Sequence, residues 1–229
     1  MKIKNIFKSL SIFEICLWSI SSLVIIISSI VTKGDIFATI TSLIGAASLI
    51  FIAKGYPLGQ ILGIAFMIMY SYISYKSKYY GELICSLLLS LPMAVYTLIV
   101  WLKHPFDKKT SQVQVGKSEK KSILVIVFLA ISFSIICYFI LKIFNTPNIF
   151  VSTLSITTSF IAVSFMAIRS PYYAIGYALN DIVLIVLWSM ETITNIMCLP
   201  VLINFIVFLA NDIYGFFNWI KIRKNQTNL

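Results

Sequence analysis

Two amide–carboxylate pairs interrupt the most apolar part of this sequence. Asn180-Asp181 lies near the middle of one apolar segment, and Asn211-Asp212 lies in the next. An ionised carboxylate that faces lipid costs several kcal/mol or more, so Asp181 is expected to face a bundle interior, a cavity or a partner. Asp212 lies nearer a helix end, where pairing with a lysine or arginine is the alternative. We predict a functional role for Asn180 and Asp181.

Aromatic side chains accompany the first pair. Tyr173, Tyr177 and Trp188 recur with Asn180 and Asp181 at steps of three and four residues, which places them on one broad helix face. Aromatic rings stack on flat heteroaromatic ligands, amides and carboxylates hydrogen-bond sugar hydroxyls, and a carboxylate favours a cationic ring. The predicted substrate-binding residues are Asn180, Asp181, Tyr177, Trp188, Asn211, Tyr173, Gln60 and Tyr70.

The sequence contains no pattern typical of a hydrolytic or metal-binding site. The four cysteines, Cys16, Cys85, Cys137 and Cys198, form no CxxC motif, and His104 is the single histidine. Such isolated cysteines in apolar segments are typical of small buried hydrophobic residues. We therefore expect no catalytic residue, no bound metal and no cofactor.

The composition indicates a membrane protein. Of 229 residues, 59% are hydrophobic and only 11% are charged, whereas about a quarter of the residues in a soluble domain are charged. The formal net charge of +10 lies in short loops and tails, a pattern that orients membrane proteins. Nucleic-acid binding is not expected.

Eight stretches approach the ~20 apolar residues that cross a bilayer. They are residues 13–32, 36–53, 58–75, 82–102, 122–143, 148–168, 172–190 and 198–220. With eight spans, fourteen lysines and arginines fall on the side of both termini, and only Lys33, Lys76, Lys78 and Lys142 fall on the other. This asymmetry places both termini in the cytoplasm of a multi-pass protein. The first span lacks a small-x-small cleavage site and is expected to remain a membrane helix.

The chain ends each of its halves with a similar segment. Tyr96 and Tyr214, Trp101 and Trp219, and Lys103 and Lys221 all pair at an offset of 118 residues. Because the fourth span is carried onto the eighth, the two copies run in the same direction, as parallel transporter repeats do. We predict an all-α membrane protein with two parallel three-helix repeats, a linker helix between them and one extra N-terminal helix. Both tryptophans end their spans and are expected to be interfacial anchors.

The predicted organisation divides the chain into five parts. These are an N-terminus with the extra helix (1–35), the first repeat (36–102), a cytoplasmic loop with the linker helix (103–147), the second repeat (148–220) and a cytoplasmic tail (221–229). The loop at 103–121 is expected to be a solvated connector.

Particular segments resemble the PnuC family of bacterial vitamin and nucleoside transporters. Lys-Gly-Tyr-Pro-Leu-Gly-Gln-Ile-Leu-Gly (54–63) and Tyr-Lys-Ser-Lys-Tyr-Tyr-Gly-Glu (75–82) look like the first repeat of that family, and Asn180 with residues 211–219 looks like the second. The resemblance implies a SWEET-like three-one-three fold, a homotrimer and facilitated diffusion of nicotinamide riboside, a precursor of NAD. It also implies a cytoplasmic kinase that traps the substrate. The family's Trp-x-x-x-Asn pattern is incomplete here, because Gly176 holds the tryptophan position.

These features predict passive uptake of nicotinamide riboside across a bacterial cell membrane. The alternatives are the same type of carrier for deoxynucleosides, thiamine or riboflavin, and the membrane subunit of an ATP-driven vitamin importer. A membrane enzyme acting on lipids would need a cluster of acids, histidines or a nucleophile near the membrane surface, which the sequence lacks.

Overall fold

The computed structural model describes residues 9–107, 112–116, 120–146 and 148–228. Six lysines of the charge count above lie outside these residues: Lys2, Lys4, Lys8, Lys108, Lys109 and Lys117. The described residues contain eight helical segments long and apolar enough to cross a membrane. This confirms the predicted helical class and the number of spans.

Seven spans consist of one helix each, and the fourth is composite. The helices are α2 (Ile12–Thr32), α3 (Ile36–Ala53), α4 (Pro57–Lys76), α7 (Lys120–Ile143), α8 (Ile149–Ala167), α9 (Tyr173–Thr194) and α10 (Leu199–Thr227). The fourth span joins α5 (Tyr80–Ile84), the π-helix η1 (Cys85–Ser90) and α6 (Leu91–Lys103), and a 3₁₀ turn, η2 (Ile196–Cys198), precedes α10. A π-helix of this kind is frequent at functional sites.

The first helix begins with a capping box that also anchors it to the bundle. Ser11 and Glu14 exchange hydrogen bonds, from Ser11 N to Glu14 Oε2 at 2.6 Å and from Glu14 N to Ser11 Oγ at 3.2 Å. The Glu14 carboxylate also pairs with Lys54 Nζ at 3.2 Å and accepts a hydrogen bond from Tyr214 Oη at 2.6 Å. These contacts fix the start of α2 to the C-terminal end of α3 and to α10.

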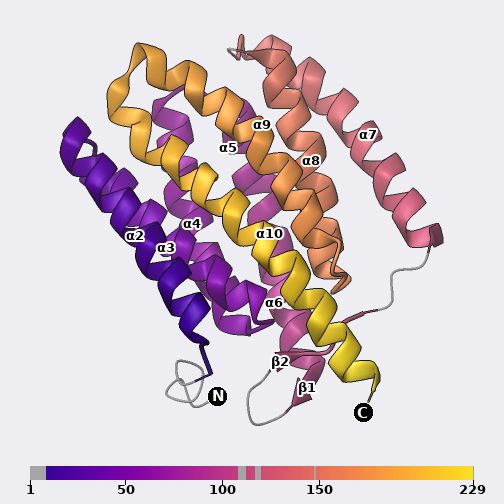
Figure 1. Cartoon of the computed structure of the whole chain (residues 1–229). Coiled ribbons are helices and arrows are strands. Elements are labelled where there is room, and N and C mark those ends of the chain that lie inside the picture. Colours follow the sequence, from indigo (N-terminus) through magenta and orange to yellow (C-terminus); the bar gives the residue numbers. More distant parts are fainter. Residues whose placement is uncertain (1–8, 108–111, 117–119, 147, 229) are drawn as a thin grey trace.

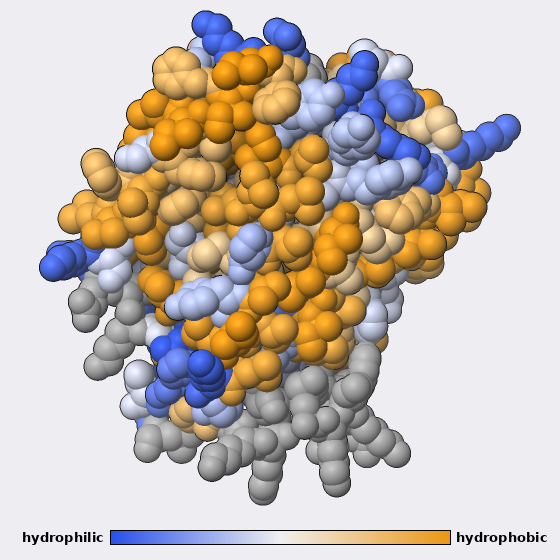
Figure 2. Space-filling view, turned by 180° about the vertical axis from the view of Figure 1, so that it is seen from behind, coloured by the Kyte–Doolittle hydropathy of each residue, from blue (hydrophilic) through white to orange (hydrophobic). Residues whose placement is uncertain are grey.

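The helices form one bundle with α2 and α7 at opposite flanks (Figure 1). α9 and α10 pack on each other, α3 packs on α4 and α10, and α7 packs mainly on α8. The start of α2 and the end of α10 lie at the same end of the bundle (Figure 1). Large apolar side chains cover a broad middle zone of the surface, while hydrophilic ones gather toward its two ends (Figure 2). A surface of this kind suits lipid, so the chain is a multi-pass membrane protein.

The segment after α6 is more ordered than the predicted connector. Two short strands, β1 (Pro105–Asp107) and β2 (Gln112–Val113), pair antiparallel. Val113 is fully buried, its N–H donates to the Gly55 carbonyl at 2.9 Å, and its carbonyl accepts from Gln226 Nε2 at 3.0 Å. The expectation of a solvated connector was wrong for this part of the loop, which closes over the ends of α3 and α10.

Two residue pairs at the 118-residue offset contact each other. The Trp101 and Trp219 rings lie 5.5 Å apart between centroids, and Trp188 Nε1 donates to Tyr70 Oη at 2.9 Å. Contacts between equivalent positions are typical of residues near a two-fold axis. Trp101 and Trp219 are fully buried, so their expected role as interfacial anchors was wrong. The division into repeats stays a prediction.

Candidate substrate-binding site

A small cavity lies among α4, the fourth span, α8, α9 and α10. Its volume is about 80 Å³. We call it the central cavity; its lining includes four predicted residues, Tyr70, Tyr177, Asn180 and Asp181. The other lining residues are Phe66, Met67, Glu82, Cys85, Ser86, Ser90, Ser159, Leu184, Phe205 and Phe208.

The Asn180 amide is held in one orientation. Its Oδ1 accepts hydrogen bonds from Thr158 Oγ1 at 2.8 Å and from Ser159 Oγ at 2.9 Å, both on α8. With Oδ1 as the acceptor shared by these two hydroxyl groups, the other terminal atom is the NH₂ group. This NH₂ group makes no hydrogen bond to another described residue. The cavity therefore has a fixed amide donor.

Glu82 is a site residue that the sequence reasoning missed. It lines the cavity, is 3% exposed, and accepts hydrogen bonds from Ser155 Oγ and, at 3.2 Å, from Tyr70 Oη. Glu82 and Tyr70 both precede the predicted linker helix, so both halves of the chain contribute polar side chains to the cavity. The signal was present in the sequence, since Glu82 is the one acidic residue of the fourth span.

Asp181 lies beside a second carboxyl group. Its neighbour is Asp212 of α10, and both side chains are almost completely buried. Because α10 continues to Thr227, Asp212 lies about four turns from the helix end rather than two. Within the described part of the chain Asp212 forms no ion pair with a lysine or arginine, contrary to the alternative considered above.

An aromatic layer closes the cavity on one side. Trp188 is fully buried, donates to Tyr70 Oη, and meets the Tyr79 ring edge-on at 5.3 Å. It supports Tyr70 instead of lining the cavity. Tyr79 Oη donates to the Leu187 carbonyl at 3.3 Å. Burial, with a smaller contribution from the Glu191 carboxylate, raises the pKa of Tyr79 well above its usual range.

A second aromatic layer lies on the other side, toward the termini. Tyr173 meets the Trp219 ring edge-on at 4.9 Å and the Tyr177 ring at 6.2 Å. Trp219 in turn packs against Trp101 with the two rings tilted by 44°, and it donates from Nε1 to the Ile52 carbonyl at 2.9 Å. Tyr173 thus belongs to this layer and does not line the central cavity.

The remaining two predicted residues are buried outside the cavity lining. Asn211 donates from Nδ2 to the Val207 carbonyl of its own helix at 2.8 Å, and its Oδ1 has no partner among the described residues. Gln60 is 4% exposed, and its Nε2 has no partner among them. The structure therefore does not bring either side chain to the cavity.

Gly176 allows α9 to approach α8 closely. A Cβ added there would lie 2.8 Å from Ala162 Cα. No larger side chain fits at this position without moving the helices apart. The rings at the cavity come from other positions instead: Phe66, Tyr70, Tyr177, Phe205 and Phe208.

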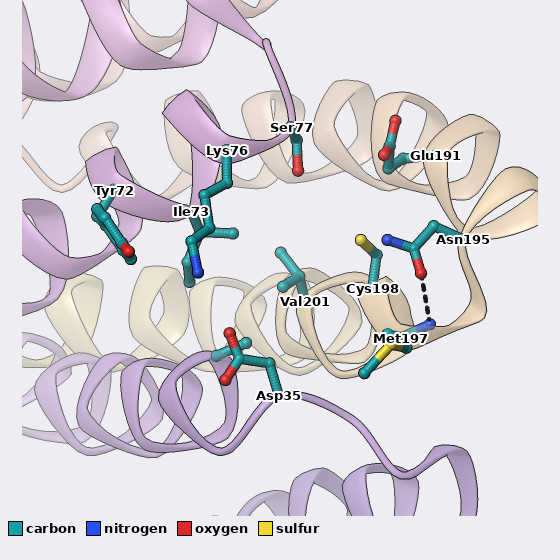
Figure 3. Close-up of a pocket in the computed structure, with 11 residues that line it drawn as sticks. Asp35, Tyr72, Ile73, Lys76, Ser77, Glu191, Asn195, Met197, Cys198 and Val201 are labelled. Atoms are coloured by element: carbon teal, nitrogen blue, oxygen red, sulfur yellow. Dashed lines mark hydrogen bonds between the residues drawn. The ribbon is translucent and has the colours of Figure 1, made fainter.

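A second pocket opens at the end of the bundle away from the termini. It has a volume of about 290 Å³ and lies among the start of α3, the end of α4, the end of α9 and the start of α10 (Figure 3). Asp35, Lys76 and Glu191 supply its charges, and Asn195 Oδ1 accepts a hydrogen bond from Met197 N at 3.2 Å (Figure 3). Along α9, Trp188 separates Leu184 of the central cavity from Glu191 of this outer pocket. Among the described residues, no group of three histidine, cysteine or acidic side chains is placed to hold a metal ion.

Comparisons with known proteins agree on one kind of relative. A family model described as nicotinamide mononucleotide transporter matches residues 35–221. The nicotinamide riboside transporter PnuC of Neisseria mucosa is 24% identical over 196 residues, which cover 83% of this chain and 74% of that protein. A crystal structure of the vitamin B3 transporter PnuC superposes with a TM-score of 0.83 and 20% identity, over 95% of this chain and 94% of that one. This superposition shows that the fold is shared.

Proposed function

Because the chain belongs to the nicotinamide mononucleotide transporter family, whose model matches residues 35–221, we propose that it carries nicotinamide riboside across the cell membrane by facilitated diffusion. The substrate binds at the central cavity, near the bilayer midplane and between the two predicted repeats. The relative from Neisseria mucosa is named as a nicotinamide riboside transporter, which supports this substrate. The relatives reported above are all named as transporters, so no catalytic activity is proposed.

The orientation of Asn180 carries the proposal. Its amide oxygen is occupied by Thr158 and Ser159, so its NH₂ group is the donor available to the substrate. The carboxyl groups of Glu82 and Asp181 line the same cavity and suit both ribose hydroxyls and a positively charged pyridinium ring. Tyr177 offers an aromatic face to that ring.

Binding requires the cavity to expand. Its volume of about 80 Å³ is well below the ~300–1,000 Å³ of typical ligand pockets. The aromatic layers around Trp188 and Trp219 separate it from the two ends of the bundle. We infer that these layers open alternately, one toward each side, as the two predicted repeats move against each other.

The wider setting follows the sequence predictions. We propose that both termini lie in the cytoplasm of a bacterial cell; the distribution of lysine and arginine supports this orientation. We propose a homotrimer in that membrane and a cytoplasmic kinase that traps the substrate by phosphorylating it. Neither ATP nor an ion gradient is then needed by the carrier itself.

The test is uptake into liposomes that hold only the purified protein. Labelled nicotinamide riboside is expected to equilibrate without ATP or an ion gradient, while thiamine, riboflavin and deoxynucleosides serve as competing substrates. Asn180→Ala is expected to abolish uptake, and Asn225→Ala, which removes the same group from the exposed end of α10, is the matched control. Uptake of another compound but not nicotinamide riboside would refute the substrate, and normal uptake by Asn180→Ala would remove that residue from the site.

A further inference from the structure

Asp181, at the central cavity, has a second buried carboxyl group, that of Asp212, beside it. Asp181 on α9 is 2% exposed and Asp212 on α10 is 3% exposed, and the two carboxyl groups lie next to each other across the interface of these helices. Asp181 lines the central cavity, and its Oδ2 accepts no hydrogen bond from any described residue. An unpartnered, buried carboxyl oxygen in the lining of a cavity is placed to meet a ligand.

No basic group neutralises this pair. The ion pair found among the described residues, Lys54–Glu14, lies elsewhere in the bundle. The titratable neighbours on α9 are the hydroxyl groups of Tyr173 and Tyr177. Neither hydroxyl group supplies a positive charge.

The helices packed against the pair add no positively charged side chain either. Neither α8 nor α3, which pack against α9 and α10, contains an acidic, basic, cysteine or tyrosine residue within its bounds. From α2 the titratable side chains are Glu14 and Cys16, and Glu14 is already bound to Lys54 and Tyr214. η2 contributes Cys198 at the far end of α10, and across the cavity lie Tyr70, Glu82 and Cys85.

Two adjacent carboxylates in a medium of low dielectric constant cannot both be ionised without a cation. The pair therefore holds at least one proton, and with two protons it is neutral. A singly protonated pair beside one positive ligand is neutral as well. The empty, doubly protonated pair and the singly protonated pair with its ligand therefore have the same total charge. The first holds one more proton, and the second holds the ligand cation.

We propose that Asp181 and Asp212 form a proton-sharing pair that selects a positively charged heteroaromatic ring and releases a proton when the ring binds. The identity of the ring as the pyridinium of nicotinamide riboside depends on the proposed function. The charges balance, because one ligand cation enters as one proton leaves to solvent, and no other group changes its charge. Proton and substrate thus compete for the same carboxyl groups.

The first test measures binding to the purified protein as a function of pH. The dissociation constant of nicotinamide riboside is expected to rise by up to about tenfold for each unit by which the pH falls, since one proton is exchanged per ligand. Nicotinic acid riboside has the same ring and sugar but no net charge, and it is expected to bind more weakly. The double variant D181N/D212N should lose both the pH dependence and the preference for the cation.

Glu82→Gln is the matched control, because it removes the other buried carboxyl group of the cavity. Whatever its affinity, this variant should keep the pH dependence. A pH dependence that survives in D181N/D212N and disappears in Glu82→Gln would overturn the proposal. So would nicotinamide riboside binding with the same affinity at every pH.

The second test does not depend on the ligand. Infrared spectroscopy of the Glu82→Gln variant at neutral pH, which removes the other buried carboxyl group of the cavity, should detect the carbonyl stretch of a protonated carboxylic acid, and adding D181N/D212N to that variant should remove the band. If nicotinamide riboside is not transported and this band is present, the proposed substrate fails and the proton-sharing pair stands. If transport occurs and the band survives D181N/D212N in the Glu82→Gln variant, the pair fails and the proposed function stands.

Discussion

The two hydroxyl groups that orient Asn180 offer a sharp test of the binding site. The perturbation is the double variant Thr158→Val/Ser159→Ala, which removes both donors to Asn180 Oδ1, at 2.8 and 2.9 Å. The amide is then free to rotate and to present its oxygen to the substrate, where a donor is needed. We expect weaker substrate binding with the fold retained.

The magnitude follows from the two hydrogen bonds. Each neutral bond contributes about 0.5–1.5 kcal/mol, so losing both costs about 1–3 kcal/mol, or roughly 5- to 150-fold in affinity. Each single variant leaves one donor in place and should cost less than half of this free energy. The assay is the concentration dependence of nicotinamide riboside uptake into liposomes, normalised to the amount of folded protein.

Thr153→Val is the matched control on the same helix. Its hydroxyl donates to the Ile149 carbonyl of its own helix at 2.7 Å and does not touch Asn180. This variant should keep the wild-type KM. An unchanged KM in the Thr158→Val/Ser159→Ala variant would refute the reasoning that a fixed amide donor binds the substrate.

Two further predictions concern packing. Gly176→Trp, which restores the aromatic position of the family pattern, is expected to destabilise the protein, because even a Cβ would lie 2.8 Å from Ala162 Cα; a monodisperse variant with an unchanged melting temperature would contradict this. Tyr70→Phe should lower the melting temperature by an amount equivalent to about 1–3 kcal/mol, because Trp188 Nε1 loses its acceptor and Glu82 loses a donor; equal thermal unfolding curves for variant and wild type would show that these groups find other partners.

The predicted spans were confirmed because lipid imposes a local requirement. Each crossing needs ~20 apolar residues in succession, and this can be counted along the chain. The expectation that Asp181 faces the interior was also confirmed, since a polar group within an apolar span is costly on a lipid-facing surface. Local periodicity correctly grouped Tyr177 with these two residues on one face of α9.

Other parts of the site depend on which helices become neighbours. Glu82 joins the cavity because Ser155 and Tyr70 hold its carboxyl group from α8 and α4. Trp188, on the predicted face of α9, supports Tyr70 from behind. The periodicity of one helix predicts which residues share a face. It does not predict which other helix that face contacts.

The sequence by itself determined that the chain crosses a membrane, where its spans lie and which polar residues within them are costly. These properties arise from short stretches of the chain meeting lipid, so each is readable without the others. Only the tertiary structure decided that Asp212 would lie beside Asp181 and that Gly176 would meet Ala162. These contacts join residues on different helices, and the packing of the whole bundle brings them together.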